Sequence, residues 1–205
     1  MPTTTDDQPD APPNTRRRAL LIALFSISAV VLVLDQASKA WAISSLVEGE
    51  RHDLVGSLLG FQLVFNPGAA LSIATGMTWV LTIVAAVVIV VVRASRRIGS
   101  WAWAVALGLL LGGALGNLVD RLVREPGVAR GEVIDFIAYA NWFVGNIADI
   151  AIVSAAVLVV ILAALGVHLD GTRDGHGPAE ADTEGGEADV DMQDEASTTT
   201  TEQNA

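Results

Sequence analysis

The pattern of apolar positions along the chain predicts four membrane-spanning helices. About 20 apolar residues in helical form cross the core of a bilayer. Four segments of the 205-residue chain reach that length: residues 19 to about 43, about 71 to 92, 101–119 and 142–167. Several of them are rich in Val and Ile, which favour strands in water. In lipid, however, a lone segment must satisfy its own backbone hydrogen bonds, so we expect an all-α membrane protein.

The first apolar segment has one alternative interpretation, a cleaved signal peptide. Arg16, Arg17 and Arg18 precede an apolar run, as in the n-region and h-region of such a peptide. The run is longer than an h-region, and it carries Asp35 and Lys39 at its far end. Three more spans follow, so a retained helix is favoured.

Composition divides the chain into an apolar body and polar ends. Overall, 52% of the residues are hydrophobic, 17% are charged and the net charge is −11. Residues 169–205 hold eleven acidic residues and one basic residue, so almost all of the net charge lies there. We therefore expect a disordered cytoplasmic segment at 1–17, a four-helix membrane domain at 18–168 and a disordered acidic cytoplasmic tail at 169–205.

Composition also excludes several classes of protein. The absence of cysteine excludes disulfides, thiol catalysis and cysteine-ligated metals. His52, His168 and His176 form no HExxH or similar pair, so no metal or cofactor is expected. The sequence lacks the basic stripe of a nucleic-acid-binding protein, so no nucleic-acid partner is expected either.

The distribution of arginine predicts the orientation in the membrane. Arginines cluster at 16–18, before the first span, and at 93–97, between the second and third spans, and such clusters mark cytoplasmic loops. Three further arginines within 121–130, between the third and fourth spans, oppose this rule but are accompanied by acidic residues. We interpret them as functional and expect both termini in the cytoplasm.

On this topology the polar residues of the spans gather near the outer face. The residues concerned are Asp35, Lys39, Asn117, Asp120, Arg121, Asp135, Asn146 and Asp149. Charged groups close to the hydrocarbon are costly, and by default they indicate function. A transporter or proton channel would need such groups across the whole membrane, yet the inner halves of the spans lack them. A scaffold protein would not need them at all.

Asp135 and Asp149 each lie in an apolar stretch with no basic residue within four positions. Two carboxyl groups that share a proton form the acid–base pair with which aspartic proteases activate water. The alternative is that each aspartate caps a helix. Asp149 lies too far inside the predicted fourth span to fit that role well.

The other charged residues suggest structural roles. Asp35 and Lys39 are four residues apart, so they share a helix face and can form an ion pair that simply holds the helix end. Asp120 and Arg121 are adjacent and cannot face each other. We expect each to find a partner elsewhere, such as a loop carbonyl or another carboxylate for Arg121.

Glycine and turn signals complete the local picture. Gly108, Gly112 and Gly116 recur every four residues in the third span, a face that lets another helix approach closely. An Asn-Pro-Gly turn at 66–68 precedes the second span, and the alternation in 61–65 suggests a short outer strand.

Five segments together resemble the signature blocks of bacterial lipoprotein signal peptidase (signal peptidase II), in the same order. They are 35–39 (DQASK), 66–72 (NPGAALS), 112–121 (GGALGNLVDR), 131–137 (GEVIDFI) and 146–149 (NIAD). The resemblance covers residues 18–167. The GxSG and GxGD motifs of other membrane proteases are absent.

The resemblance implies a four-helix intramembrane aspartic endopeptidase of the bacterial cytoplasmic (inner) membrane, monomeric and without cofactor. Such an enzyme cleaves diacylglyceryl-modified prolipoproteins just before the lipidated cysteine, works among membrane lipid and is inhibited by globomycin. Asp135 and Asp149 match its catalytic aspartates. Residues that shape the site or bind substrate match as well: Asp35, Lys39, Asn66, Gly68, Asn117, Asp120, Arg121 and Asn146.

The resemblance also implies a small extracytoplasmic β-cradle and a short helix over the site, supplied by residues 48–66 and 124–141. Two positions depart from the family pattern. Leu71 and Gly145 each stand where the family usually has Phe. Neither departure touches the aspartates.

Overall fold

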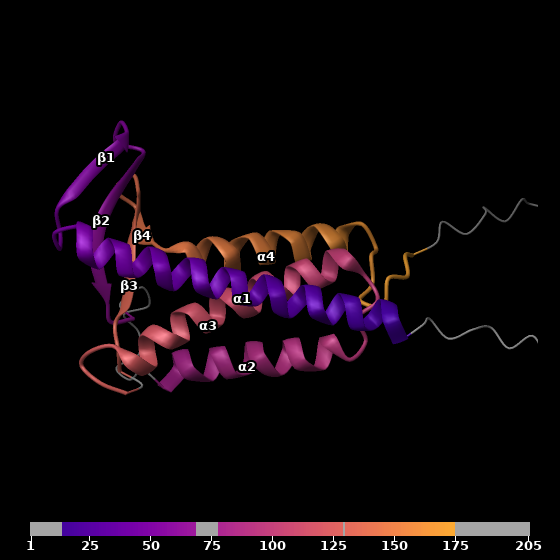
Figure 1. Ribbon diagram of the computed structural model, residues 1–205. Helices are drawn as coiled ribbons and strands as arrows, with labels where there is room; N and C mark the ends of the chain where they lie inside the picture. The colour runs from indigo at the N-terminus through magenta and orange to yellow at the C-terminus, as the bar shows by residue number, and fades with distance from the viewer. Residues whose placement is uncertain (1–13, 69–77, 129, 175–205) are drawn as a thin grey trace, which may run out of the picture. The chain divides into compact units, whose positions relative to one another are not determined.

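The computed structural model describes residues 14–68, 78–128 and 130–174. The chain order of the elements is α1 (Asn14–Ser45), β1 (Arg51–Val55), β2 (Leu59–Asn66), α2 (Thr78–Ser95), α3 (Trp101–Val123), β3 (Val133–Tyr139), β4 (Phe143–Gly145) and α4 (Ile147–Ala164). The helices lie alongside one another, and the sheet is at one end of them (Figure 1). The termini predicted to be disordered, and Leu71, lie largely or wholly outside the described residues.

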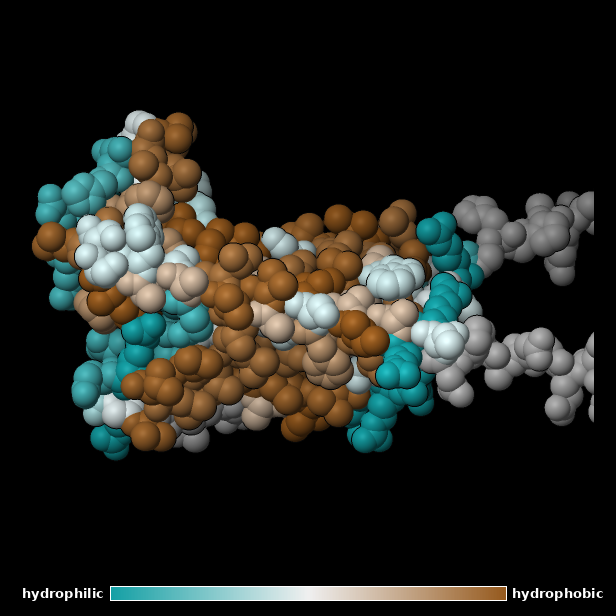
Figure 2. All heavy atoms as spheres, viewed as in Figure 1, coloured by the Kyte–Doolittle hydropathy of each residue, from teal (hydrophilic) through white to brown (hydrophobic). Residues whose placement is uncertain are grey.

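Three of the described helices, α1, α3 and α4, are long and apolar enough to cross a membrane. A fourth apolar stretch, Ile83–Ser95 in α2, is shorter, and the start of the predicted second span lies outside the described residues. Hydrophobic residues cover the middle of the visible face, and hydrophilic residues gather at its two ends (Figure 2). This belt is the surface expected of a protein whose helices are embedded in lipid.

The predicted start of the fourth span is wrong by five residues. Residues 142–145 belong to a turn and to β4, and α4 begins at Ile147. The apolar run continues without a break from strand to helix, so hydropathy alone does not mark the boundary. The boundary is set by Asn146, which has extended backbone angles and caps the helix.

Helix α3 is the centre of the bundle, since it packs against α1, α2 and α4. Its small residues make the approach close. A Cβ added at Gly112 would lie 2.7 Å from the Cβ of Val31 on α1, and one added at Gly113 would lie 2.6 Å from the carbonyl oxygen of Ala148 on α4. The glycine face therefore packs helices on two sides, as the small-residue spacing predicts.

The four strands form one antiparallel sheet in the order β1-β2-β3-β4. The strand predicted around residues 61–65 is confirmed as part of β2. Trp41 on α1 makes edge-on ring contacts with Phe61 and Phe136, with centroids 5.1 and 6.1 Å apart, and so seats the sheet on the end of the helix. The described residues of 48–66 and 124–141 form strands and turns, and no helix occurs among them.

After α4 the described chain turns back across the opposite end of the bundle. The amide of Gly99 donates to the carbonyl of Leu169, and Val167 pairs with Arg173 in an isolated bridge. The indole nitrogen of Trp103 donates to the carbonyl of Val167 over 2.9 Å. The loop 166–174 is thus held against the start of α3. The domain boundaries predicted after residues 17 and 168 stay predictions.

Candidate active site

Asp135 lies in the middle of β3 and is only 3% exposed. Its register places it on the same face of the sheet as Asn66, diagonally across from it on β2. Both of its carboxylate oxygens accept amide hydrogen bonds, from Asn66 Nδ2 at 2.8 Å and from Asn146 Nδ2 at 2.7 Å. Burial raises the pKa of Asp135 to about 6, against the opposing effect of the bond from Asn66.

Asp149 lies in the first turn of α4, and here the sequence interpretation needs correction. The aspartate does take part in capping. Asn146 and Asp149 form a capping box, in which the Asn146 side chain accepts from the Asp149 amide and the Asp149 side chain accepts from the Asn146 amide. Because α4 starts at Ile147, Asp149 is its third residue rather than a residue inside the span. Its other oxygen accepts from Asn117 Nδ2 at 3.0 Å.

Asn146 and Asn117 connect the two aspartates. Asn146 Nδ2 donates to Asp135 and also, over 3.2 Å, to Asn117 Oδ1. Asn117 in turn donates to Asp149. A continuous chain of side-chain amides therefore joins the carboxylates, and each carboxylate is fixed by donors from two other parts of the fold.

Lys39 binds this chain of amides through Asn117 and fixes its position. Its ammonium group is fully buried and uses all three donors, on Asp35 Oδ2 at 2.7 Å, Asp120 Oδ2 at 2.7 Å and Asn117 Oδ1 at 3.0 Å. The predicted Asp35–Lys39 ion pair is confirmed. A buried cation with every proton bonded holds its neighbours in a single geometry.

The two carboxylate partners of Lys39 extend the network into α4 and the sheet. Asp35 also accepts from the backbone amide of Ala148 at 2.9 Å. Asp120 accepts from the amide of Ile134, next to Asp135, at 3.3 Å and pairs with Arg124 at 2.6 Å. The positions of both catalytic candidates are therefore tied to α1 and α3.

Arg121 finds the loop carbonyls that the sequence suggested. Its Nη1 donates to the carbonyls of Asn66 at 3.1 Å and Gly131 at 3.0 Å. Gly68, with φ of +101°, donates its amide to Asn66 Oδ1 at 2.9 Å, which sets the orientation of the Asn66 amide toward Asp135. Arg121 thus fixes the backbone at Asn66, and Gly68 fixes the orientation of the Asn66 side chain.

The structure brings all ten predicted site residues into this region and adds Gln36, which the sequence interpretation missed, and Arg124, which it interpreted only as one of three functional arginines. Gln36 donates to Asp35, to the carbonyl of Gly116 and to Asp120, and Arg124 pairs with Asp120. Arg124 carried a signal, because it is four residues after Asp120. Gln36 carried none beyond its place between Asp35 and Lys39.

Gly145 lies against Asp149, so the expectation that this departure from the family pattern does not touch the aspartates is wrong. A Cβ added there would lie 3.0 Å from Asp149 Oδ2. Within the described residues, no group of three or more His, Asp and Glu side chains is arranged to hold a metal ion. Leu71 lies outside the described residues.

Two aspartates held in an amide and ion-pair network, at one end of apolar helices, form a candidate acid–base site of a membrane protein. Comparison with known proteins gives the family of the chain. A profile of the family described as signal peptidase (SPase) II matches residues 27–165. The chain belongs to the signal peptidase II family, which indicates a peptidase, and it is a multi-pass membrane protein.

Curated relatives and solved structures support this assignment. The lipoprotein signal peptidase of Rhodococcus jostii is 51% identical over 175 residues, which cover 83% of this chain and 87% of the relative. That of Streptomyces griseus is 47% identical over 158 residues, covering 77% and 81%. A bacterial membrane enzyme solved by the in meso method matches with a TM-score of 0.60 and 28% identity, covering 68% of this chain and 91% of that one.

Proposed function

We propose that this protein is an aspartic endopeptidase that removes signal peptides from diacylglyceryl-modified prolipoproteins, just before the lipidated cysteine. The observation that carries the proposal is the pairing of Asp135 and Asp149 through Asn146, which contacts both. Family membership supplies the substrate class. The proposal includes a location in the bacterial cytoplasmic membrane, with the site toward the outer face and both termini in the cytoplasm, and the arginine clusters at 16–18 and 93–97 support this orientation.

The charges in the network support one shared proton on the aspartate pair. The bonded groups include three cations, Lys39, Arg121 and Arg124, and two further carboxylates, Asp35 and Asp120. With one proton on the pair, the site is neutral overall. A second negative charge on the pair would be unbalanced in a poorly solvated place, and that is costly. Such coupled carboxyl groups titrate as a pair.

In the proposed reaction the ionised carboxylate takes a proton from water as the water oxygen attacks the scissile carbonyl. The protonated carboxyl group hydrogen-bonds to that carbonyl and stabilises the developing tetrahedral intermediate. As the C–N bond breaks, a proton passes to the leaving amine. The products are a carboxylic acid at the end of the signal peptide and a free amine on the cysteine, and the pair ends with one proton again.

The supporting residues keep this geometry. The carboxylates are held by side-chain amides of Asn66, Asn117 and Asn146. These donors do not titrate, so the two aspartates alone gain or lose the protons of the reaction. The site lies where the helices meet the sheet, so the acyl chains of the substrate lie in lipid while its peptide bond reaches Asp135 and Asp149. Globomycin would occupy the pair and compete with substrate.

The decisive test is cleavage of a purified diacylglyceryl-modified prolipoprotein in detergent, followed by the release of the signal peptide on a gel. Wild type is expected to cleave and globomycin to block it, while Asp135→Asn and Asp149→Asn remove turnover. Asp53→Asn is the matched control, because Asp53 is exposed on β1 and pairs with Arg51, away from the network. Turnover near the wild-type rate in either site variant would refute the assignment of the pair.

A further inference from the structure

The end of the bundle opposite the aspartates carries a second candidate site, built from arginines. A cavity of about 240 Å³ is lined by Arg16 and Arg17 from α1 and by Arg96 and Arg97 from the link after α2. Buried apolar side chains, Leu20 and Ile98, also line it. Its volume is several times the roughly 30 Å³ that one water molecule takes up in the liquid.

Within the described part of the chain, the arginines of this cavity have no ion-pair partner. None of the four guanidinium groups forms an ion pair or a side-chain hydrogen bond with any of the described residues. One carboxylate, Asp170, also lines the cavity, but both Thr172 Oγ1 and the Thr172 amide donate to it. Among the residues that the structure describes, four cations therefore line one cavity together with a single carboxylate, which is already hydrogen-bonded.

The level of the cavity along the bundle matches that of lipid headgroups. Arg16 and Arg17 lie just before the apolar run of α1, and Arg96 and Arg97 follow the apolar run of α2 directly. Trp101, 53% exposed at the first turn of α3, is the residue type that anchors helices at this boundary. The cavity thus sits where the phosphates of one leaflet lie, with hydrocarbon-facing helix surface beside it.

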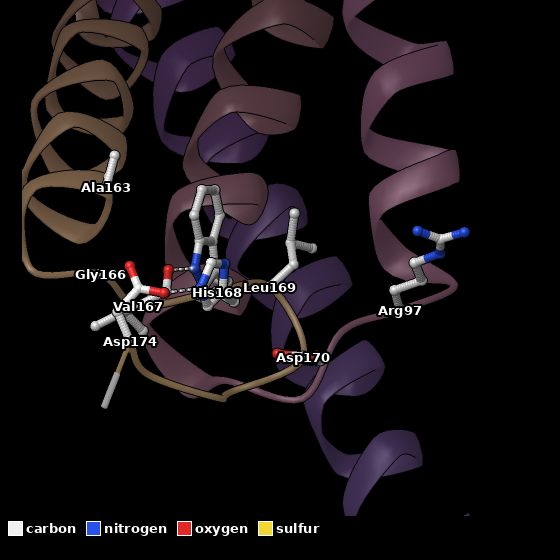
Figure 3. A pocket seen from close by; sticks show the side chains of 9 residues that line it. Arg97, Ala163, Gly166, Val167, His168, Leu169, Asp170 and Asp174 are labelled. Carbon is white, nitrogen blue, oxygen red and sulfur yellow. Dashed lines mark hydrogen bonds and ion pairs between the residues drawn. The ribbon is translucent and has the colours of Figure 1, made fainter. Parts of the chain in front are cut away.

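The loop 166–174 closes one side of the cavity. Arg97 and Asp170 line both this cavity and a neighbouring one of about 490 Å³, which His168 and Asp174 also line. Figure 3 shows Asp170 on this loop between Arg97 and the bonded pair His168–Asp174. Hydrogen bonds within this loop fix the carboxylate of Asp170 beside the arginines.

We propose that this cavity binds the phosphate of an anionic phospholipid in the leaflet farther from Asp135 and Asp149. Guanidinium groups suit the ligand because each presents a planar pair of donors to two phosphate oxygens. The apolar lining and the adjoining helix surface suit the glycerol and the acyl chains. The fit is to a lipid with a net negative headgroup, because a zwitterionic headgroup brings its own cation to a site that already has four.

The test is a titration of the full-length protein in detergent micelles with phosphatidylglycerol, counting bound lipid by native mass spectrometry. Phosphatidylcholine is the zwitterionic comparison, and inorganic phosphate is added alone and as a competitor. The double variant Arg17→Gln/Arg96→Gln removes one arginine from each side of the cavity. The matched control, Arg18→Gln/Arg93→Gln, removes the same charge from neighbouring positions that do not line it.

We expect wild type and the control to bind phosphatidylglycerol in preference to phosphatidylcholine. The cavity variant should bind it roughly 25-fold more weakly, about five-fold for each arginine removed. If the double variant is not monodisperse, Arg17→Gln and Arg96→Gln are measured singly, with about five-fold expected for each. Equal losses in the cavity and control variants would overturn the proposal in favour of general surface charge. Displacement of the lipid by millimolar inorganic phosphate would overturn a lipid as the occupant.

Discussion

Asn146 has two separable tasks, and replacing it with serine removes only one of them. Its side-chain oxygen caps α4 by accepting from the Asp149 amide, and its nitrogen donates to Asp135 over 2.7 Å. Serine is as good an N-cap as asparagine. Its shorter side chain carries no amide group to reach Asp135 and Asn117. Asn146→Ser therefore keeps the helix start and deletes the donor.

The hydrogen bond from Asn146 determines how far, and in which direction, Asn146→Ser changes the pKa of Asp135. A hydrogen bond to a charged group contributes roughly 1.5–3 kcal/mol, and this one favours the ionised form of Asp135. One pKa unit corresponds to about 1.4 kcal/mol, so losing the donor raises the pKa of Asp135 by roughly 1–2 units. The pKa starts from about 6 because of burial. The limb of the pH–rate profile that reports Asp135 is therefore expected between roughly pH 7 and 8.

The assay is the initial rate of prolipoprotein cleavage from pH 4 to 9, together with the melting temperature in the same detergent. Asn146→Ala is the partner variant. It should shift the profile similarly but melt at a lower temperature, because it also loses the cap, at a cost of about 1 kcal/mol. A wild-type pH profile in Asn146→Ser, in protein that melts normally, would refute the argument that this amide sets the ionisation of Asp135.

Three further predictions follow from the network and the packing. Lys39→Met leaves the fully buried Asp35 without its cation and Asp120 with Arg124 alone, so we expect a loss of about 3–5 kcal/mol and little monodisperse protein on size exclusion; a normal yield would contradict this. Gly112→Ala places a Cβ 2.7 Å from Val31 Cβ and should cost about 1–3 kcal/mol, seen as a lower melting temperature; unchanged melting would argue against close α1–α3 packing. The pKa of Asp135 is raised from 3.8 to about 6 in the folded state, so the folded protein disfavours its ionised form. The contribution of Asp135 to stability is therefore greatest below about pH 4 and falls by up to about 3 kcal/mol as pH rises to about 6. Melting curves from pH 4 to 7 should show that fall in wild type and a smaller one in Asp135→Asn.

Local patterns in the sequence were enough to predict the packing face and the ion pair. The Asp35–Lys39 spacing and the glycine repeat of α3 depend on residues three or four apart on one helix, and both are confirmed. The gathering of polar groups at one end followed from counting spans. It required only that consecutive helices alternate in direction.

Local sequence patterns could not predict the hydrogen bonds that the asparagines donate to the two aspartates. Asn66 reaches Asp135 because of the β2–β3 register, which includes an irregularity between Phe61 and Val64 that no single segment specifies. The start of α4 was placed too early because β4 is as apolar as the helix that follows it. The correct start makes Asp149 a capping residue and a site residue at once.

The i, i+4 ion pairs have a consequence for how the protein enters the membrane. Lys39 meets Asp35 on α1, and Asp120 meets Arg124 on α3, so each helix carries a cation and an anion in reach of one another along its own axis. Either helix can enter lipid with these charges already compensated, before its neighbours arrive. The cross-helix bond between Lys39 and Asp120 then forms only when α1 and α3 meet. In a chain delivered one helix at a time, the candidate site is therefore completed only at the last step, when α4 brings Asp149 to Asn117.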